Sequence, residues 1–138
     1  MRAAERYDYA VVRVVPRVDR GEFVNAGILL CAATSNWLAA RMELDEGKLR
    51  CMDPTADVAM ARRHLDAITA ICAGTATHPI ALQPARPRFH WLTAQRSTII
   101  QMSPVHCGLS NDLDQTLAHL FERLVATPRE RMPRRSAG

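Results

Sequence analysis

The chain has 138 residues, of which 48% are hydrophobic and 23% are charged, and its formal net charge is +4. A chain of this length fits one domain with one hydrophobic core, and this composition excludes the intrinsically disordered class. The longest apolar run, Ala26 to Ala33, is far shorter than the roughly 20 residues of a membrane-spanning helix. The start of the chain carries no apolar export signal, so we expect a soluble, cytoplasmic protein without a membrane partner.

The first third of the chain is predicted to form an antiparallel meander of three strands. Residues 7–15 are rich in β-branched and aromatic residues and end before Pro16, which cannot continue a central strand. A loop leads to a second strand at 24–33. A polar turn then precedes a third strand at 37–44, where apolar and polar residues alternate.

The pattern changes to helical periodicity after Asp53. An aspartate can accept hydrogen bonds from the first free N–H groups of a helix, and proline is well tolerated at the first helical position. Asp53-Pro54 therefore predicts the start of a helix over 54–73, with Gly74 as its left-handed C-cap. Apolar residues recur along this segment at helical spacing: Val58, Ala61, Leu65, Ile68 and Cys72.

The middle of the chain is interrupted by prolines. Residues 75–87 are predicted to be an extended surface connection, with a short edge strand at 80–82 as the alternative. Residues 88–95 are ambiguous between strand and helix, and Pro87 at a first helical position favours a short helix. That helix would place Phe89 and Leu92 on one face.

The last third is predicted to contain one strand and one helix. Residues 97–103 alternate like a strand that ends at Pro104. Ser110 or Asn111 can cap a helix over 110–126 with a stripe of leucine and phenylalanine.

These elements predict an α+β domain over residues 1–127. The expected architecture is an antiparallel sheet, made of the meander and the later strand, with two amphipathic helices packed on one face. Residues 128–138 are predicted to be a disordered basic tail. The tail carries most of the net positive charge, so we expect no nucleic-acid binding beyond weak contacts by its arginines.

The cysteines and histidines do not form a metal-binding pattern. Cys31, Cys51, Cys72 and Cys107 are widely spaced, without a Cys-x-x-Cys pair, and the histidines are scattered. The sequence therefore predicts four reduced thiols and no metal. It also shows no glycine-rich phosphate loop, so we expect no cofactor.

The candidate site residues are polar side chains at the ends of predicted strands. Burying such groups without a partner costs roughly 1–3 kcal/mol each, so they must pair with one another or face a ligand. Two segments carry them, Arg20 to Gly27 and Arg96 to His106. The predicted binding residues are Arg13, Arg20, Glu22, Asn25, Arg96, Gln101, Ser103 and His106.

Each of these residues has a structural and a functional interpretation. Arg13, Arg20 and Arg96 can form an anion clamp, because a guanidinium binds phosphate or carboxylate through two parallel hydrogen bonds. The alternative is a network of Arg13 with Glu22 and Asn25 that ties the loop to the sheet. Glu22 and His106 are the candidate catalytic residues, as a general acid and base, if the fold brings them together.

Ser103 has a similar pair of interpretations. It could serve as a nucleophile, but no Gly-x-Ser-x-Gly turn surrounds it, and a hydroxyl that holds the end of the strand is favoured.

The segments 9–16, 20–30 and 96–106, followed by the closing leucine-rich helix, resemble the uncharacterised bacterial family called domain of unknown function 3037. The resemblance covers about residues 7–126. The family has no established activity. The resemblance implies a small accessory or regulatory protein that is encoded near kinases similar to HipA.

Two hypotheses on function follow. The first is a binding or regulatory module that contacts another protein, such as a kinase similar to HipA, through the sheet around Arg13, Glu22 and Asn25. The second is a small enzyme that acts on a phosphate- or carboxylate-bearing substrate through the arginines and Glu22 or His106. A concave pocket that collects these side chains would favour the enzyme, and an exposed patch would favour the binding module.

Overall fold

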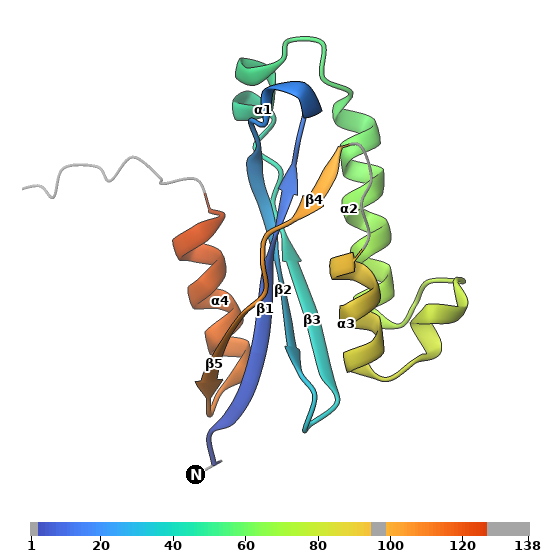
Figure 1. Ribbon diagram of the computed structural model, residues 1–138, viewed down its shortest axis with the longest axis vertical. Coiled ribbons are helices and arrows are strands. Elements are labelled where there is room, and N and C mark those ends of the chain that lie inside the picture. The colour runs from blue at the N-terminus through green and yellow to red at the C-terminus, as the bar shows by residue number, and fades with distance from the viewer. Residues whose placement is uncertain (1–2, 95–98, 127–138) are drawn as a thin grey trace, which may run out of the picture.

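An antiparallel sheet organises the computed structural model, which describes residues 3–94 and 99–126. The strand order is β3-β2-β1-β4, and β5 also pairs with β1 (Figure 1). The predicted meander of the first three strands is confirmed. The strands are β1 (Glu5–Val14), β2 (Val24–Ala32), β3 (Trp37–Met42), β4 (Ile100–Met102) and β5 (His106–Ser110).

Helices accompany the sheet, and the predicted α+β class is confirmed. Two short 3₁₀ helices, η1 (Val18–Arg20) and η2 (Pro79–Leu82), lie in connections. In the described part of the chain, no helix has both the length and the apolar character needed to cross a bilayer. The α-helices are α1 (Glu46–Met52), α2 (Val58–Ala73), α3 (Ala85–Ala94) and α4 (Leu113–Leu124).

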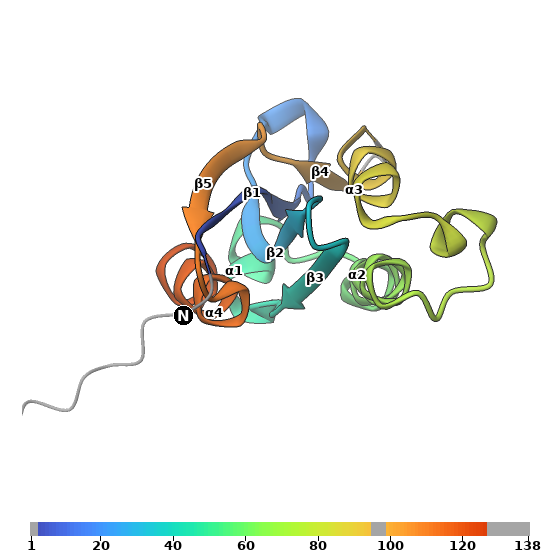
Figure 2. The same cartoon turned by 90° about the horizontal axis from the view of Figure 1, so that it is seen from below.

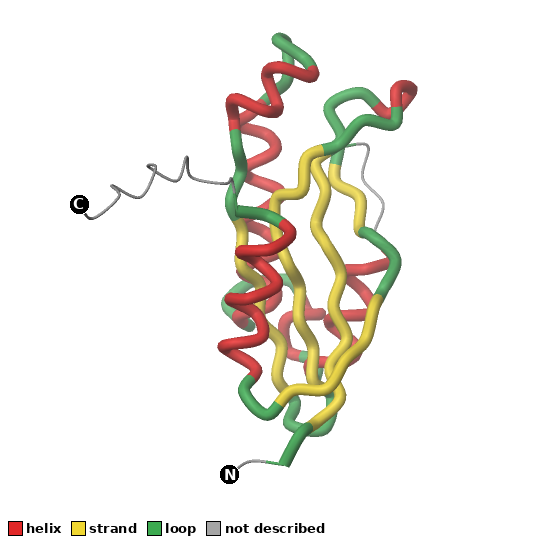
Figure 3. The backbone as a smooth tube through the Cα atoms, turned by 90° about the vertical axis from the view of Figure 1, so that its left-hand side faces the viewer, coloured by secondary structure: helices red, strands yellow, loops and turns green. Residues whose placement is uncertain are grey.

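The helices cover both faces of the sheet, which corrects the expectation that the two amphipathic helices pack on one face. In Figure 2, α2 and α3 lie on one side of the strands and α4 on the other, and Figure 3 looks from the side of α4. The reason is visible in the central strands. Val12 and Leu29 enter the core under α2, whereas Val11 and Ile28 enter the core under α4. With both faces apolar, one layer of helices would leave a hydrophobic face exposed.

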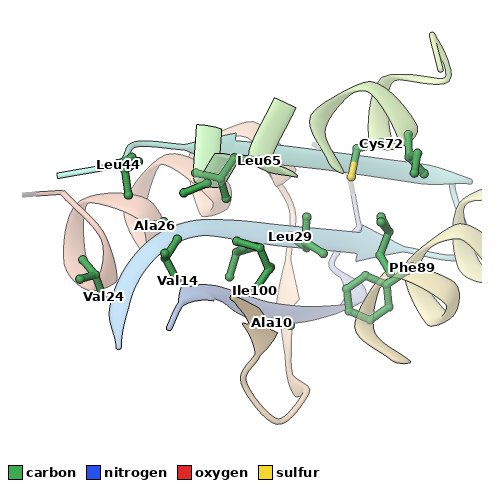
Figure 4. Close-up of a cluster of buried hydrophobic side chains, with 14 of the residues drawn as sticks. Ala10, Val14, Val24, Ala26, Leu29, Leu44, Leu65, Cys72, Phe89 and Ile100 are labelled. Atoms are coloured by element: carbon green, nitrogen blue, oxygen red, sulfur yellow. The ribbon is translucent and has the colours of Figure 1, made fainter. Parts of the chain in front are cut away.

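The larger core lies between the sheet, α2 and α3 (Figure 4). Val14, Leu29 and Ile100 come from three strands, and Leu65 and Phe89 come from the two helices. All five side chains are at most 5% exposed. This core packs α3 mainly against β2 and β3.

A β-bulge at Ala26 sets the face of the sheet on which Asn25 lies. Val12 pairs with Gly27, but the next residue, Arg13, pairs with Asn25, so Ala26 has no partner of its own. One extra residue reverses the alternation along the strand. Asn25 therefore lies on the same face as Arg13.

The expected start of the long helix at Asp53-Pro54 is wrong, because a short helix precedes it. Asp45 caps α1 through the Lys48 N–H, and Asp53 ends that helix by accepting hydrogen bonds from Thr55. Asp57 is the N-cap of α2, since its side chain accepts from the Met60 N–H. The left-handed C-cap predicted at Gly74 is confirmed, with φ of 75°.

The proline-rich middle segment is only partly extended. Residues 80–82 belong to η2 and not to the alternative edge strand. The short helix is confirmed as α3, with Phe89 and Leu92 buried, although it begins at Ala85, two residues before Pro87. Its first N–H is held by Asn36 Oδ1 at 2.7 Å, which ties the helix to the turn between β2 and β3.

The last third differs from the prediction at two points. The strand β5 was not predicted, because its side chains are mostly exposed and show no alternation. The cap of α4 is Asp112, which accepts from the Gln115 N–H, and not Ser110 or Asn111. Ser110 is the last residue of β5 and accepts a hydrogen bond from the Asp112 N–H. Arg96, the first residues of the predicted fourth strand and the tail at 128–138 lie outside the described residues.

Candidate functional site

Several predicted site residues meet at the end of β1, where a loop leads to β2. We call this surface the loop patch and define it as Arg13, Val18, Arg20, Glu22 and Phe23. The guanidinium carbon of Arg13 lies 4.2 Å from the centre of the Phe23 ring. Phe23 is 40% exposed and Val18 is 56% exposed. The patch therefore offers apolar surface next to a cation.

The acidic residue of the loop patch pairs with the arginine two positions before it. Glu22 accepts a hydrogen bond from Arg20 Nε, and both side chains are largely exposed. Arg13 is stabilised instead by the π-face of Phe23. Of the three arginines of the predicted clamp, Arg20 thus pairs with Glu22 and Arg13 stacks on Phe23. Arg96 lies outside the described residues.

Arg13 is flanked on the same face by two more predicted residues. It pairs with Asn25 of β2 on one side and with Gln101 of β4 on the other, and directly opposed residues point to one face of a sheet. Asn25 Nδ2 donates to the Leu124 carbonyl at the end of α4, at 3.0 Å. Arg13 Nε and Asn25 Oδ1 are buried and have no hydrogen-bond partner in the described structure. Hydrogen-bonding capacity beside the patch is therefore unused.

A hollow of about 410 Å³ adjoins the loop patch. Phe23 and Asn25 form one side of it, and the ends of α1 and α4 form the other. Lys48 and Arg123 bring two further positive charges to its rim. Together with Arg13, these residues make the surroundings of Phe23 cationic.

Ser103 has the structural role that the sequence favours. Its hydroxyl accepts a hydrogen bond from the Val11 N–H at 2.8 Å and donates to the Pro104 carbonyl at 2.9 Å. The backbone N–H of Ser103 donates to the Val11 carbonyl. The side chain thus bridges the break between β4 and β5, both of which pair with β1.

The fold does not bring Glu22 and His106 together. His106 pairs with Tyr9 in the sheet and stacks on its ring at 5.3 Å. Glu22 lies beyond Val14, at the opposite end of this part of β1. At about 3.4 Å per residue, the five residues from Tyr9 to Val14 span roughly 17 Å. The two side chains cannot act as acid and base on the same bond.

A polar cleft that the sequence analysis missed lies on the other face of the sheet. Asp8 is buried at 6% exposure in β1, and Arg86 Nη1 of α3 donates to Asp8 Oδ2 at 2.8 Å. Arg6 Nη2 approaches Asp8 Oδ1 at 3.5 Å. The signal available in the sequence was a single carboxylate inside an apolar strand, because a buried charge requires a partner.

The cleft has a volume of about 870 Å³ and lies between α3 and the break between β4 and β5. Of the predicted site residues, Gln101 and Ser103 contribute to its lining. The charged and polar lining also comes from β1 and α3, and the apolar lining includes Phe89, Met102, Pro104 and Val105.

The buried thiols of Cys31 and Cys72 are not suited to act as nucleophiles or metal ligands. Burial raises the pKa of Cys31 to about 11 and that of Cys72 to about 12, because a thiolate would lose its hydration there. Cys51 and Cys107 are exposed, and all four thiols are free. Within the described ranges, no group of three or more His, Cys, Asp or Glu side chains is placed to hold a metal ion.

Comparison with curated proteins and with solved structures finds no match. A family model does match, over residues 9–125, and this range includes β2 to α4 and most of β1. It therefore covers the loop patch, Asn25, Gln101, Ser103 and His106. The chain belongs to the family described as "Protein of unknown function (DUF3037)".

Proposed function

We propose that this protein is a cytoplasmic binding module that docks an acidic, partly apolar segment of another protein on the loop patch. The observation that carries the proposal is the Arg13–Phe23 pair, an exposed aromatic ring stacked on a cation. Aromatic and arginine side chains dominate the energetics of protein interfaces.

Charge supports an acidic partner. Arg13, Lys48 and Arg123 surround Phe23, whereas Glu22 is neutralised by Arg20. A segment with carboxylates would pair with these cations, and an apolar side chain would cover the exposed ring of Phe23. The resemblance to the family makes a kinase similar to HipA the first partner to test.

The distribution of the predicted catalytic residues supports the binding module over the enzyme. An acid and base pair must reach one substrate, and Glu22 and His106 lie at different places along β1. Glu22 is held in an exposed ion pair with Arg20, and His106 stacks on Tyr9.

Site-specific photocrosslinking tests the proposal. Phe23 is replaced by p-benzoylphenylalanine in cells that express the protein, and Leu109 of β5, which is 74% exposed, is replaced in the same way as a matched control. We expect one partner to crosslink from position 23 and not from position 109. The purified partner should then bind the wild-type chain about tenfold more tightly than the Phe23→Ala chain. Equal crosslinking from both positions, or none from position 23, would contradict the proposal.

A further inference from the structure

We propose that the cleft between α3 and the broken edge of the sheet binds a small organic anion, a carboxylate or phosphate group attached to an apolar body. The cleft lies beside α3 at the β4–β5 edge of the sheet, and no residue of the loop patch lines it. This site is therefore independent of the proposed partner surface.

The charges in the cleft favour an anion. The side chains of Arg6 and Arg86 both contact Asp8, so two guanidinium groups face one carboxylate. Each uses one terminal nitrogen for this contact, and in the described structure neither makes another ion pair or hydrogen bond. A guanidinium has five N–H donors. The remaining donors are free to bind the oxygens of a ligand, and His90 adds a further polar group at the lining.

Arg86 and its carboxylate partner are held in place before any ligand binds. Asp8 is fixed by strand pairing with Cys31 on one side and Cys107 on the other. Arg86 lies in the first turn of α3, whose start is anchored by the Asn36 side chain. Preorganised donors bind more tightly because less side-chain freedom is lost on binding.

The apolar lining indicates the chemical character of the rest of the ligand. Phe89 lies in the middle of α3, and Met102, Pro104 and Val105 line the cleft near the break between β4 and β5. A volume of about 870 Å³ falls within the range of small-molecule sites, roughly 300–1,000 Å³. An inorganic ion would leave this apolar wall uncovered, so an anion with an aromatic or aliphatic body fits better.

Titration with three related probes tests the site by NMR on the full chain labelled with ¹⁵N. Benzoate supplies the carboxylate, phenyl phosphate supplies the phosphate, and benzamide is the neutral control of the same shape. We expect at least one anion to shift the amide signals of Phe89, His90, Thr93 and Ser103, with a Kd at least about tenfold lower than that of benzamide. The tighter of the two anions identifies the preferred group.

Arginine variants assign the binding to the cleft. Arg6→Gln is the main variant, because the Arg6 side chain is 68% exposed and its contact with Asp8 is long, so the fold does not depend on it. It should weaken the binding of the anion about tenfold. Arg86→Lys should weaken it as well, and Arg63→Gln, an exposed arginine of α2 outside the cleft, should not. Equal binding of benzamide, no shift with either anion, or an unchanged Kd in Arg6→Gln would overturn the proposal.

Discussion

Arg13 of β1 stacks on the ring of Phe23, with 4.2 Å between the guanidinium carbon and the ring centre. The contact joins the end of the first strand to the residue that precedes the second. A cation over an aromatic ring contributes about 0.5–1 kcal/mol at an exposed site and more when it is desolvated. The positive charge of Arg13 is therefore stabilised by an aromatic ring and not by a carboxylate.

Glu22→Gln is predicted to have a small effect on stability. The Arg20–Glu22 pair is exposed, so its loss should lower the unfolding free energy by about 1 kcal/mol or less. Because Arg13 and Glu22 have different partners, the effects of Glu22→Gln and Arg13→Met should add within about 0.5 kcal/mol in urea unfolding. The pair Arg13→Met and Phe23→Ala should show coupling instead. Strong coupling between Arg13 and Glu22 would show that the two side chains interact directly.

Ser103→Ala is predicted to cost about 1–3 kcal/mol, because it leaves the buried Val11 N–H without its acceptor. The Val11 amide should also exchange with solvent faster than in the wild type, which hydrogen exchange followed by NMR measures. Ser35→Ala, which removes an exposed hydroxyl contact with Glu5, serves as the control and should change stability little. Unchanged protection of Val11 would mean that the break in the strand is held by backbone groups alone.

Gly27→Ala is predicted to destabilise the sheet by about 1–3 kcal/mol through overpacking. A Cβ at this position would overlap Met42 Sδ and lie 3.0 Å from the Arg41 carbonyl oxygen of β3. Gly47→Ala in α1 is the matched control, since alanine favours helix and the position is exposed. Thermal unfolding should separate the two variants. An equally stable Gly27→Ala chain would show that β2 and β3 can move apart at this point without cost.

The elements with strong periodicity could be predicted from the sequence, and the short or exposed ones could not. β-branched and apolar runs marked β1 and β2, alternation marked β3, and helical spacing marked most of α2 and α4. By contrast, α1 buries only Leu49, and β5 exposes three of its five residues, so neither leaves a periodic pattern. The bulge at Ala26, which puts Asn25 on the face of Arg13, is a property of strand pairing and not of local sequence.

The candidate site residues were likewise predictable only in part. Polar residues at strand ends indicated Arg13, Asn25 and Ser103, and these do lie beside one another or bridge strands. The link between Asp8 and Arg86 spans 78 positions and depends on how α3 docks on the sheet. Only the tertiary structure brings these two residues together.

The two core cysteines are predicted to make stability fall in alkaline solution. The unfolded thiols ionise near their ordinary pKa of 9.0, whereas the folded ones ionise near 11 and 12. Between these values the folded chain holds more protons, so raising the pH favours unfolding. The contribution is complete below pH 9 and is lost as the pH rises toward 11 to 12.

Thiol labelling and denaturation together check this prediction. At pH 8, Cys51 and Cys107 should react with a thiol reagent while Cys31 and Cys72 react only on unfolding. The Cys31→Ala, Cys72→Ala double variant should lose much of the decline in unfolding free energy above pH 9. A decline that stays unchanged in this variant would assign it to other groups.

The most direct test of the binding function is isothermal titration of the purified crosslinked partner with three forms of the chain. The wild-type chain should bind, and Phe23→Ala should bind about tenfold more weakly because the exposed ring is the centre of the docking surface. Leu109→Ala, which removes a more exposed side chain from β5, should bind like the wild type. Affinity should also fall as salt is raised, since cations surround Phe23. If Phe23→Ala binds as tightly as the wild type, the loop patch is not the surface that contacts the partner.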